Sequence, residues 1–291
     1  MIRPAAILAA LFFLAVSVQP AAAAPKLRVI TTLFPIYDMA RQIGADKADV
    51  SLLLPPGVEP HSFEPKFGDI VRINRADVFI YTGPLMEPWV ADLLKGTVNK
   101  DLVVIEAGRG VKIVGHDPHI WLDFDNAKIM VRNIAGAFET RDGGNERTYE
   151  QNAAVYERKL SALDESFRLG LGHCRVRQIV YGGHYAFGYL ARRYGLKYLA
   201  AQGLSPDAEP TVDDLTRLVK QIRREKIKSI FYEELTSPKI AETIAGETGA
   251  RLLLLNGGHN VTRDQLKNGI TFFDILQADL NNLELGMECK E

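Results

Sequence analysis

Short apolar runs alternate with helical patterns along most of the chain. In the first half, apolar runs over 27–31, 50–54, 78–81 and 102–105 predict strands, and periodic patterns over 35–43, 68–74, 89–94 and 126–138 predict helices. The second half repeats this scheme, with strands expected over 178–181, 197–200, 229–232 and 251–255 and helices over 186–194, 212–225, 238–248 and 271–285. Such alternation is typical of mainly parallel sheets covered by helices on both faces.

One long amphipathic helix is predicted between these halves, over 145–171. Its apolar positions are spaced alternately by four and three residues, which predicts one buried face: Tyr149, Ala153, Tyr156, Leu160, Leu163 and Phe167. At about 1.5 Å per residue it would extend about 39 Å, enough to join two bodies. We therefore expect an α/β fold with two pseudo-symmetric lobes, 25–141 and 172–291, each containing a mainly parallel sheet. A rigid connecting helix within 142–171 would join them.

Residues 1–24 have the pattern of a cleaved signal peptide. Arg3 precedes an apolar run over 6–18, and alanines suited to signal peptidase follow at 21–24. An uncleaved membrane anchor needs about 20 apolar residues, and this run is shorter. Since no cysteine follows the run, we expect a periplasmic protein without a lipid anchor.

The net charge and the cysteine content limit which binding partners and which cellular compartment are expected. The net charge of -1 gives no reason to expect binding to nucleic acid or to anionic lipid. The two cysteines, Cys174 and Cys289, fit no zinc-finger spacing. In an oxidising compartment they are expected to form a disulfide.

Four histidines stand out as candidate metal ligands. His61, His184 and His259 each follow a predicted strand, and His119 lies in the segment before the helix at 126–138. Ligands of parallel sheets bind outside the carboxyl ends of the strands. If the two sheets face each other, His61 and His119 lie opposite His184 and His259 across a cleft. Imidazoles suit zinc far better than calcium or magnesium, which prefer oxygen.

Each candidate also has a purely structural interpretation. His119 can be a buried turn residue, His184 a helix cap and His259 the start of a polar loop. Gly182 and Gly183 are expected to allow a tight turn before His184, and the positive end of the following helix is expected to keep that imidazole neutral.

Other polar residues are weaker candidates. Asp123 is interpreted as the cap of the next helix rather than as a partner for a histidine. His116 and His173 are interpreted as surface residues. Three glutamates remain possible carboxylate ligands, although neighbouring prolines mark them mainly as loop residues: Glu59, Glu64 and Glu209.

Three motifs carry a family resemblance: Pro55-Pro56-Gly57 through His61, Asp117-Pro118-His119 through Asp123, and Gly183 to Leu190 with Arg193 to Leu196. Together they resemble the zinc and manganese solute-binding proteins of bacterial ABC importers, the ZnuA/TroA-like group, over essentially the whole mature chain. The resemblance implies two lobes joined by a rigid helix, one metal in the cleft, and delivery to an inner-membrane permease. It also implies His61, His119 and His184 as ligands.

The fourth ligand departs from the family pattern. Many relatives place an Asp after the last strand, where this chain has Asn256-Gly257-Gly258-His259. We expect His259 to take that role, with water or Glu59 as the alternative. Since imidazoles must be deprotonated to bind, metal affinity is expected to fall below about pH 6.5.

The leading hypothesis is a monomeric, non-enzymatic periplasmic zinc-binding protein that feeds an ABC importer. Manganese is the alternative metal within that class. A secreted zinc hydrolase is a weaker alternative, because His-Glu-x-x-His is absent and no carboxylate is placed as a general base. A binding protein for an organic ligand such as a siderophore would need an aromatic or arginine-lined cleft, whereas this sequence has histidines at the corresponding positions.

Overall fold

The computed structural model describes residues 25–204, 210–235 and 237–290. The predicted signal peptide, 1–24, and the candidate Glu209 lie outside the described residues. None of the described helices is long and apolar enough to cross a bilayer.

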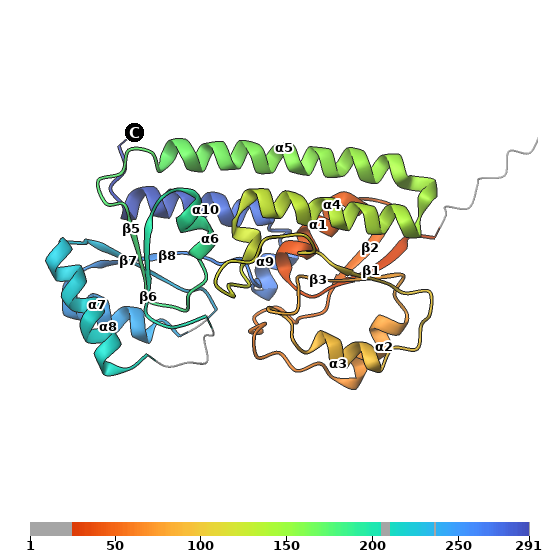
Figure 1. Ribbon diagram of the computed structural model, residues 1–291, viewed down its shortest axis with the longest axis horizontal. Helices are drawn as coiled ribbons and strands as arrows, with labels where there is room; N and C mark the ends of the chain where they lie inside the picture. Colours follow the sequence, from red (N-terminus) through yellow and green to blue (C-terminus); the bar gives the residue numbers. More distant parts are fainter. Residues whose placement is uncertain (1–24, 205–209, 236, 291) are drawn as a thin grey trace, which may run out of the picture.

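Two four-stranded parallel sheets form the centres of the two lobes (Figure 1). In the first lobe the spatial order is β2-β1-β3-β4, and in the second it is β6-β5-β7-β8, so the first strand of each sheet pairs with the second and the third. This identical order confirms the predicted pair of pseudo-symmetric α/β lobes. The strands are β1 Leu27–Thr31, β2 Ala48–Leu52, β3 Val78–Tyr81, β4 Val103–Glu106, β5 Gln178–Tyr181, β6 Lys197–Ala200, β7 Ser229–Tyr232 and β8 Arg251–Leu254.

Helices cover both faces of each sheet. In Figure 1, α2 and α3 lie below the first sheet and α7 and α8 below the second, on the side opposite the long helix α5. The helices other than α5 are α1 Phe34–Gly44, α2 Phe67–Asn74, α3 Val90–Lys95, α4 Phe124–Arg141, α6 Gly188–Arg193, α7 Val212–Glu225, α8 Lys239–Thr248, α9 Arg263–Lys267 and α10 Phe272–Gly286. The sequence pattern did not predict α9, because five residues are too few to show a helical period.

Helix α5, Glu146–Gly170, spans both lobes (Figure 1). Its buried residues are the six that the spacing predicted: Tyr149, Ala153, Tyr156, Leu160, Leu163 and Phe167. They pack against α1 and α4 of the first lobe and against α10 of the second. One hydrophobic core extends through both lobes from Leu27 to Met287, whereas the outer face of each sheet has a small core of its own. The lobes therefore share their inner packing.

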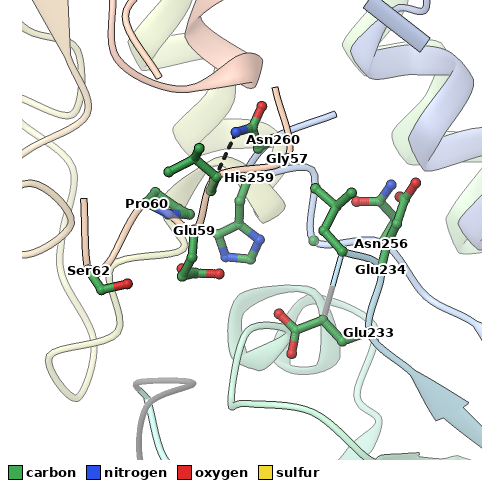
Figure 2. Close-up of a pocket in the computed structure, with 12 residues that line it drawn as sticks. Gly57, Glu59, Pro60, Ser62, Glu233, Glu234, Asn256, His259 and Asn260 are labelled. Carbon is green, nitrogen blue, oxygen red and sulfur yellow. Dashed lines mark hydrogen bonds between the residues drawn. The ribbon is translucent and has the colours of Figure 1, made fainter. Parts of the chain in front are cut away.

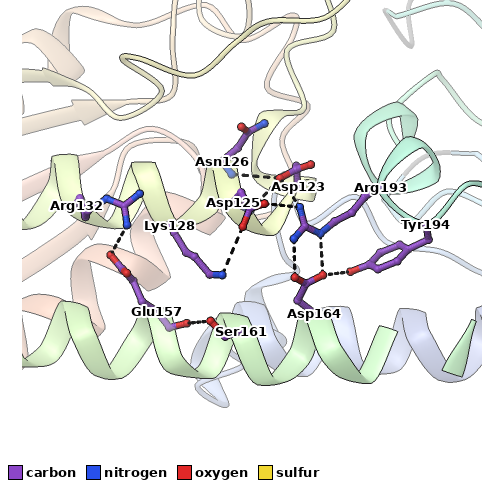
Figure 3. A network of polar contacts seen from close by, with 10 residues as sticks. All are labelled: Asp123, Asp125, Asn126, Lys128, Arg132, Glu157, Ser161, Asp164, Arg193 and Tyr194. Atoms are coloured by element: carbon purple, nitrogen blue, oxygen red, sulfur yellow. Dashed lines mark hydrogen bonds and ion pairs between the residues drawn. The ribbon is translucent and has the colours of Figure 1, made fainter. Parts of the chain in front are cut away.

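A network of ion pairs adds polar ties between the lobes (Figure 3). Arg193 of α6 donates to both carboxylate oxygens of Asp164 on α5, at 2.7 and 2.6 Å. The same guanidinium reaches Asp123 and Asp125 at the start of α4, at 3.1 and 2.9 Å. Tyr194 donates its hydroxyl to Asp164 at 2.7 Å. One side chain of the second lobe thus binds both the connecting helix and the first lobe.

A second tie lies at a buried carboxylate of α1. Asp38 is fully buried, and it accepts hydrogen bonds from the Tyr156 hydroxyl on α5 and the Phe272 amide at the start of α10. The predicted disulfide between Cys174 and Cys289 is confirmed, and it joins the segment after α5 to the segment after α10.

Candidate metal centre

The four candidate histidines converge between the lobes. His61 lies in the loop after β2, and His119 lies directly before a 3-10 turn at Ile120–Leu122. His184 follows β5 and His259 follows β8. One nitrogen of each ring lies within 4.8 Å of the others, and no other side chain of the described residues belongs to this group. The structure thus brings together the four candidate histidines, two from each lobe, as predicted for two sheets that face each other.

His119 and His184 form the inner pair of this group. Both side chains are fully buried, and their Nε2 atoms lie 3.2 Å apart. The Nδ1 atom of His119 lies 2.7 Å from Asp117 Oδ1, and the Nδ1 atom of His184 lies 2.7 Å from Glu233 Oε1. A carboxylate beside Nδ1 favours the tautomer with the proton there, which leaves Nε2 free to bind a metal.

Asp117 and Glu233 also bind the backbone amides of the two histidines that they orient. Asp117 Oδ1 accepts the His119 amide at 3.0 Å, and Glu233 Oε2 accepts the His184 amide at 3.2 Å. Sequence reasoning did not single out either residue. The Asp-x-His spacing of Asp117 was a usable signal, whereas the contact of Glu233 with a histidine 49 residues away depends on strand order.

Glycines before His184 provide space rather than an unusual backbone conformation. The backbone bends at Gly182 and Gly183, as expected, although neither is among the described residues with positive φ. A Cβ at Gly183 would overlap the Glu233 carboxylate, and one at Gly182 would overlap Ala241. Helix α6 begins only at Gly188, so the close partner of His184 is Glu233 rather than a helix terminus.

His61 and His259 form the outer pair, and their ring centroids lie 5.9 Å apart. The Nε2 atom of each is buried and has no hydrogen-bond partner among the described residues. The His259 ring packs edge-on against Trp121, with 5.3 Å between ring centroids. Buried polar atoms are normally paired, so two unpaired nitrogens in a cluster of imidazoles fit a metal-binding site.

Burial favours the neutral form of three of these imidazoles. Together, burial and the neighbouring His184 lower the pKa of His61 to about 4, with burial the larger cause. Burial likewise holds the pKa values of His119 and His259 well below the usual range. Neutral imidazole is the form that binds metal, so these three donors need not lose protons at pH 7.

The remaining candidates lie outside the donor group. His116 and His173 are exposed, as expected. Asp123 accepts the amides of Asp125 and Asn126, which confirms it as the cap of α4. Glu64 is exposed, and Glu59 accepts the His61 amide at 3.1 Å instead of entering the group.

A cleft of about 230 Å³ opens beside His259 between the two lobes. Figure 2 shows Glu59 of the first lobe on one side of the His259 ring, with Glu233 and Glu234 of the second lobe on the other. Carboxylates that line a cleft attract cations. Of the four histidines, His259 lines this cleft.

Two lobes joined by a shared helix, with four imidazoles between them, define a two-lobed metal-binding protein. The chain belongs to the family described as zinc-uptake complex component A, periplasmic (ZnuA), whose model matches residues 29–286. It is a binding component of an uptake system and not an enzyme.

Two similar zinc-binding proteins and one similar crystal structure support this family assignment. The chain is 34% identical over 278 residues to the high-affinity zinc uptake system protein ZnuA of Bacillus subtilis, covering 89% of this chain and 87% of that protein. It is 35% identical to the zinc-binding lipoprotein AdcA of Streptococcus pneumoniae, covering 95% of this chain but 59% of AdcA. The crystal structure of the Zn(II)-bound ZnuA-like domain of AdcA matches with a TM-score of 0.81 at 34% identity, over 91% of this chain and 100% of that domain.

Proposed function

We propose that this protein binds one zinc ion with high affinity through His61, His119, His184 and His259 and delivers it to the permease of an ABC importer. The observation that carries the proposal is the set of four ring nitrogens within 4.8 Å of one another. Four imidazole donors at this spacing suit the tetrahedral coordination that zinc prefers. The names of the relatives, a zinc uptake protein and a zinc-binding lipoprotein, point to the same metal.

Zinc is favoured over manganese by the donor type. Manganese is best served by carboxylate, carbonyl and water oxygens, whereas imidazole suits zinc. The carboxylates of Asp117 and Glu233 approach Nδ1 atoms of histidines, where they orient the rings.

Metal analysis of untagged protein, followed by titration with zinc and with manganese against a chelator, tests this function. We expect one zinc per chain and much tighter binding of zinc than of manganese. Tighter binding of manganese would assign the protein to the alternative metal, and no binding of either ion would refute the proposal.

We further propose a monomer that is free in the periplasm. All four donors come from one chain, so the site needs no second copy. Both cysteines are engaged in the disulfide, which leaves neither thiol for lipid attachment. Residues 25–141 and 172–291 are proposed as the two lobes, with the connecting helix within 142–171. Sedimentation velocity and the intact mass of protein recovered from the periplasm test these points.

A further inference from the structure

The segment 257–261 belongs to the second lobe by sequence, but the first lobe holds it in place. Trp121 donates its indole N–H to the Gly257 carbonyl at 2.8 Å. The Phe34 amide donates to the His259 carbonyl at 3.2 Å. The Gly57 amide donates to the Val261 carbonyl at 3.0 Å. The backbone around His259 is therefore fixed from across the cleft.

The side chain of Asn260 binds in the opposite direction, from the second lobe to a loop of the first. It is 3% exposed, and its amide nitrogen donates to the carbonyls of Pro55 and Val58, each at 2.8 Å. Figure 2 shows the Asn260 amide directed at this loop. Its own oxygen accepts the Val261 amide at 2.8 Å, so donor and acceptor are both engaged. The contacted loop leads to His61, three residues beyond Val58.

His61 and His259 are the two donors whose rings form no ion pair with a carboxylate among the described residues. Asn260 adjoins one of them in the chain and binds the loop that carries the other. We propose that Asn260 is a positioning residue that holds His61 and His259 at the separation a tetrahedral metal ion requires. It orients the outer pair, as Asp117 and Glu233 orient the inner pair.

The physical reason is preorganisation. Without the Asn260 amide, the two loop carbonyls lose their donor and the loop with His61 gains freedom. Binding must then supply the cost of ordering that loop, so affinity falls although no ligand has been removed. Residues that orient metal ligands typically contribute about 10- to 100-fold to metal affinity.

Asn260→Ala, titrated with zinc against a chelator, tests this inference, which rests on the proposed zinc site. We expect about tenfold weaker binding than in the parent chain. Asn133→Ala is the matched control, because Asn133 also donates to two loop carbonyls, of Ala107 and Arg109, away from the histidines. We expect that control to stay within about twofold of the parent. If the parent binds no zinc, the proposed function fails; if the parent binds and Asn260→Ala binds equally well, only this inference fails.

Two further measurements separate positioning from general destabilisation. Cobalt(II) serves as a spectroscopic probe, because its visible absorption is much stronger in tetrahedral than in six-coordinate sites. We expect Asn260→Ala to weaken these bands and Asn133→Ala to leave them unchanged; unchanged bands in both would overturn the inference. Adding Asn260→Ala to the His61→Ala/His259→Ala variant should cause no further loss of zinc affinity, whereas a full additional loss would show that Asn260 acts elsewhere.

Asn260→Ser is the second variant, for use if Asn260→Ala does not fold. Its hydroxyl can supply one donor in place of two. We expect a loss in the same direction but smaller, about threefold. Binding equal to that of the parent in a folded Asn260→Ser protein, together with an unchanged cobalt spectrum, would overturn the inference.

Discussion

The inner and outer histidine pairs of the proposed site lie in different settings. His119 and His184 are fully buried and each lies 2.7 Å from a carboxylate. Within the part of the chain that the structure describes, His61 and His259 have no such partner, and loop contacts between the lobes set their positions. A carboxylate makes an imidazole a stronger donor, whereas a loop contact only limits where the ring can go. The difference suggests a division of roles, in which the inner pair supplies affinity and the outer pair admits and releases the ion.

The largest expected effect comes from removing one donor of each pair. His184→Ala should weaken zinc binding by about 100-fold or more, about 2.7 kcal/mol, because it removes a buried donor and leaves Glu233 without its partner. His259→Ala should cost about tenfold, since water can replace an outer ligand. Titration against a competing chelator measures both.

Two results would change this picture. If His259→Ala binds zinc as tightly as the parent, His259 is not a ligand. If both variants lose affinity equally, the inner and outer pairs do not differ in strength.

Removing the charge of the carboxylates beside the inner pair should cause a smaller loss of zinc affinity and tests whether these carboxylates orient the histidines. Glu233→Gln and Asp117→Asn each keep the shape of the side chain but remove the charge beside Nδ1, so zinc should bind about tenfold more weakly. Glu234→Gln is the control, because Glu234 lines the same cleft but bonds to Gln265 rather than to a histidine. Equal losses in Glu233→Gln and Glu234→Gln would point to the net charge of the cleft instead of orientation.

Some features of the fold and of the site could be predicted from local sequence patterns. Local periodicity was sufficient for α5, because six apolar residues at helical spacing can bury only one face. Strand ends were sufficient to predict that His61, His184 and His259 come together, because parallel strands place their following loops at one edge, whereas His119 lies before the 3-10 turn at Ile120–Leu122.

Contacts between distant segments were not predictable in the same way. Trp121 and Gly257 are 136 residues apart, and Asn260 lies 205 residues from Pro55. Nothing in the local pattern of either segment specifies such a partner. Gly183 illustrates the same limit, since its role is to leave room for Glu233, which only the folded packing brings near.

The pH dependence should be weaker than free histidines would give. Because burial lowers the pKa of His61 to about 4 and holds those of His119 and His259 well below the usual range, protons on these three rings should not compete with zinc between pH 7 and 5.5. We expect affinity to fall by no more than about tenfold over that range, the loss that a single ring with the ordinary pKa of about 6.5 would give. Titrations with a chelator calibrated at each pH measure this; a steep fall from pH 6.5 would contradict it.

The same pKa shifts predict the stability of the metal-free protein. The unfolded chain binds protons on these histidines below about pH 6.5, while the folded chain does not until about pH 4 for His61. Stability is therefore fully present above pH 6.5 and is lost as pH falls towards 4. Thermal unfolding of metal-free protein should show a falling midpoint over this window.

The smallest expected effect is a change of shape when the metal binds. Lobes joined by flexible strands can close widely on a ligand, but here α5 packs against both lobes and a single core runs through them. Arg193 and Asp38 add polar ties between the lobes at two places. Separating the lobes would break these contacts and expose apolar surface, whereas moving the loops that carry His61 and His259 would not. We therefore expect the radius of gyration from X-ray scattering to be the same with and without zinc, within error. A clear decrease in the radius of gyration on adding zinc would mean that the lobes hinge. His61 and His259 would then move with their lobes rather than through shifts of their loops.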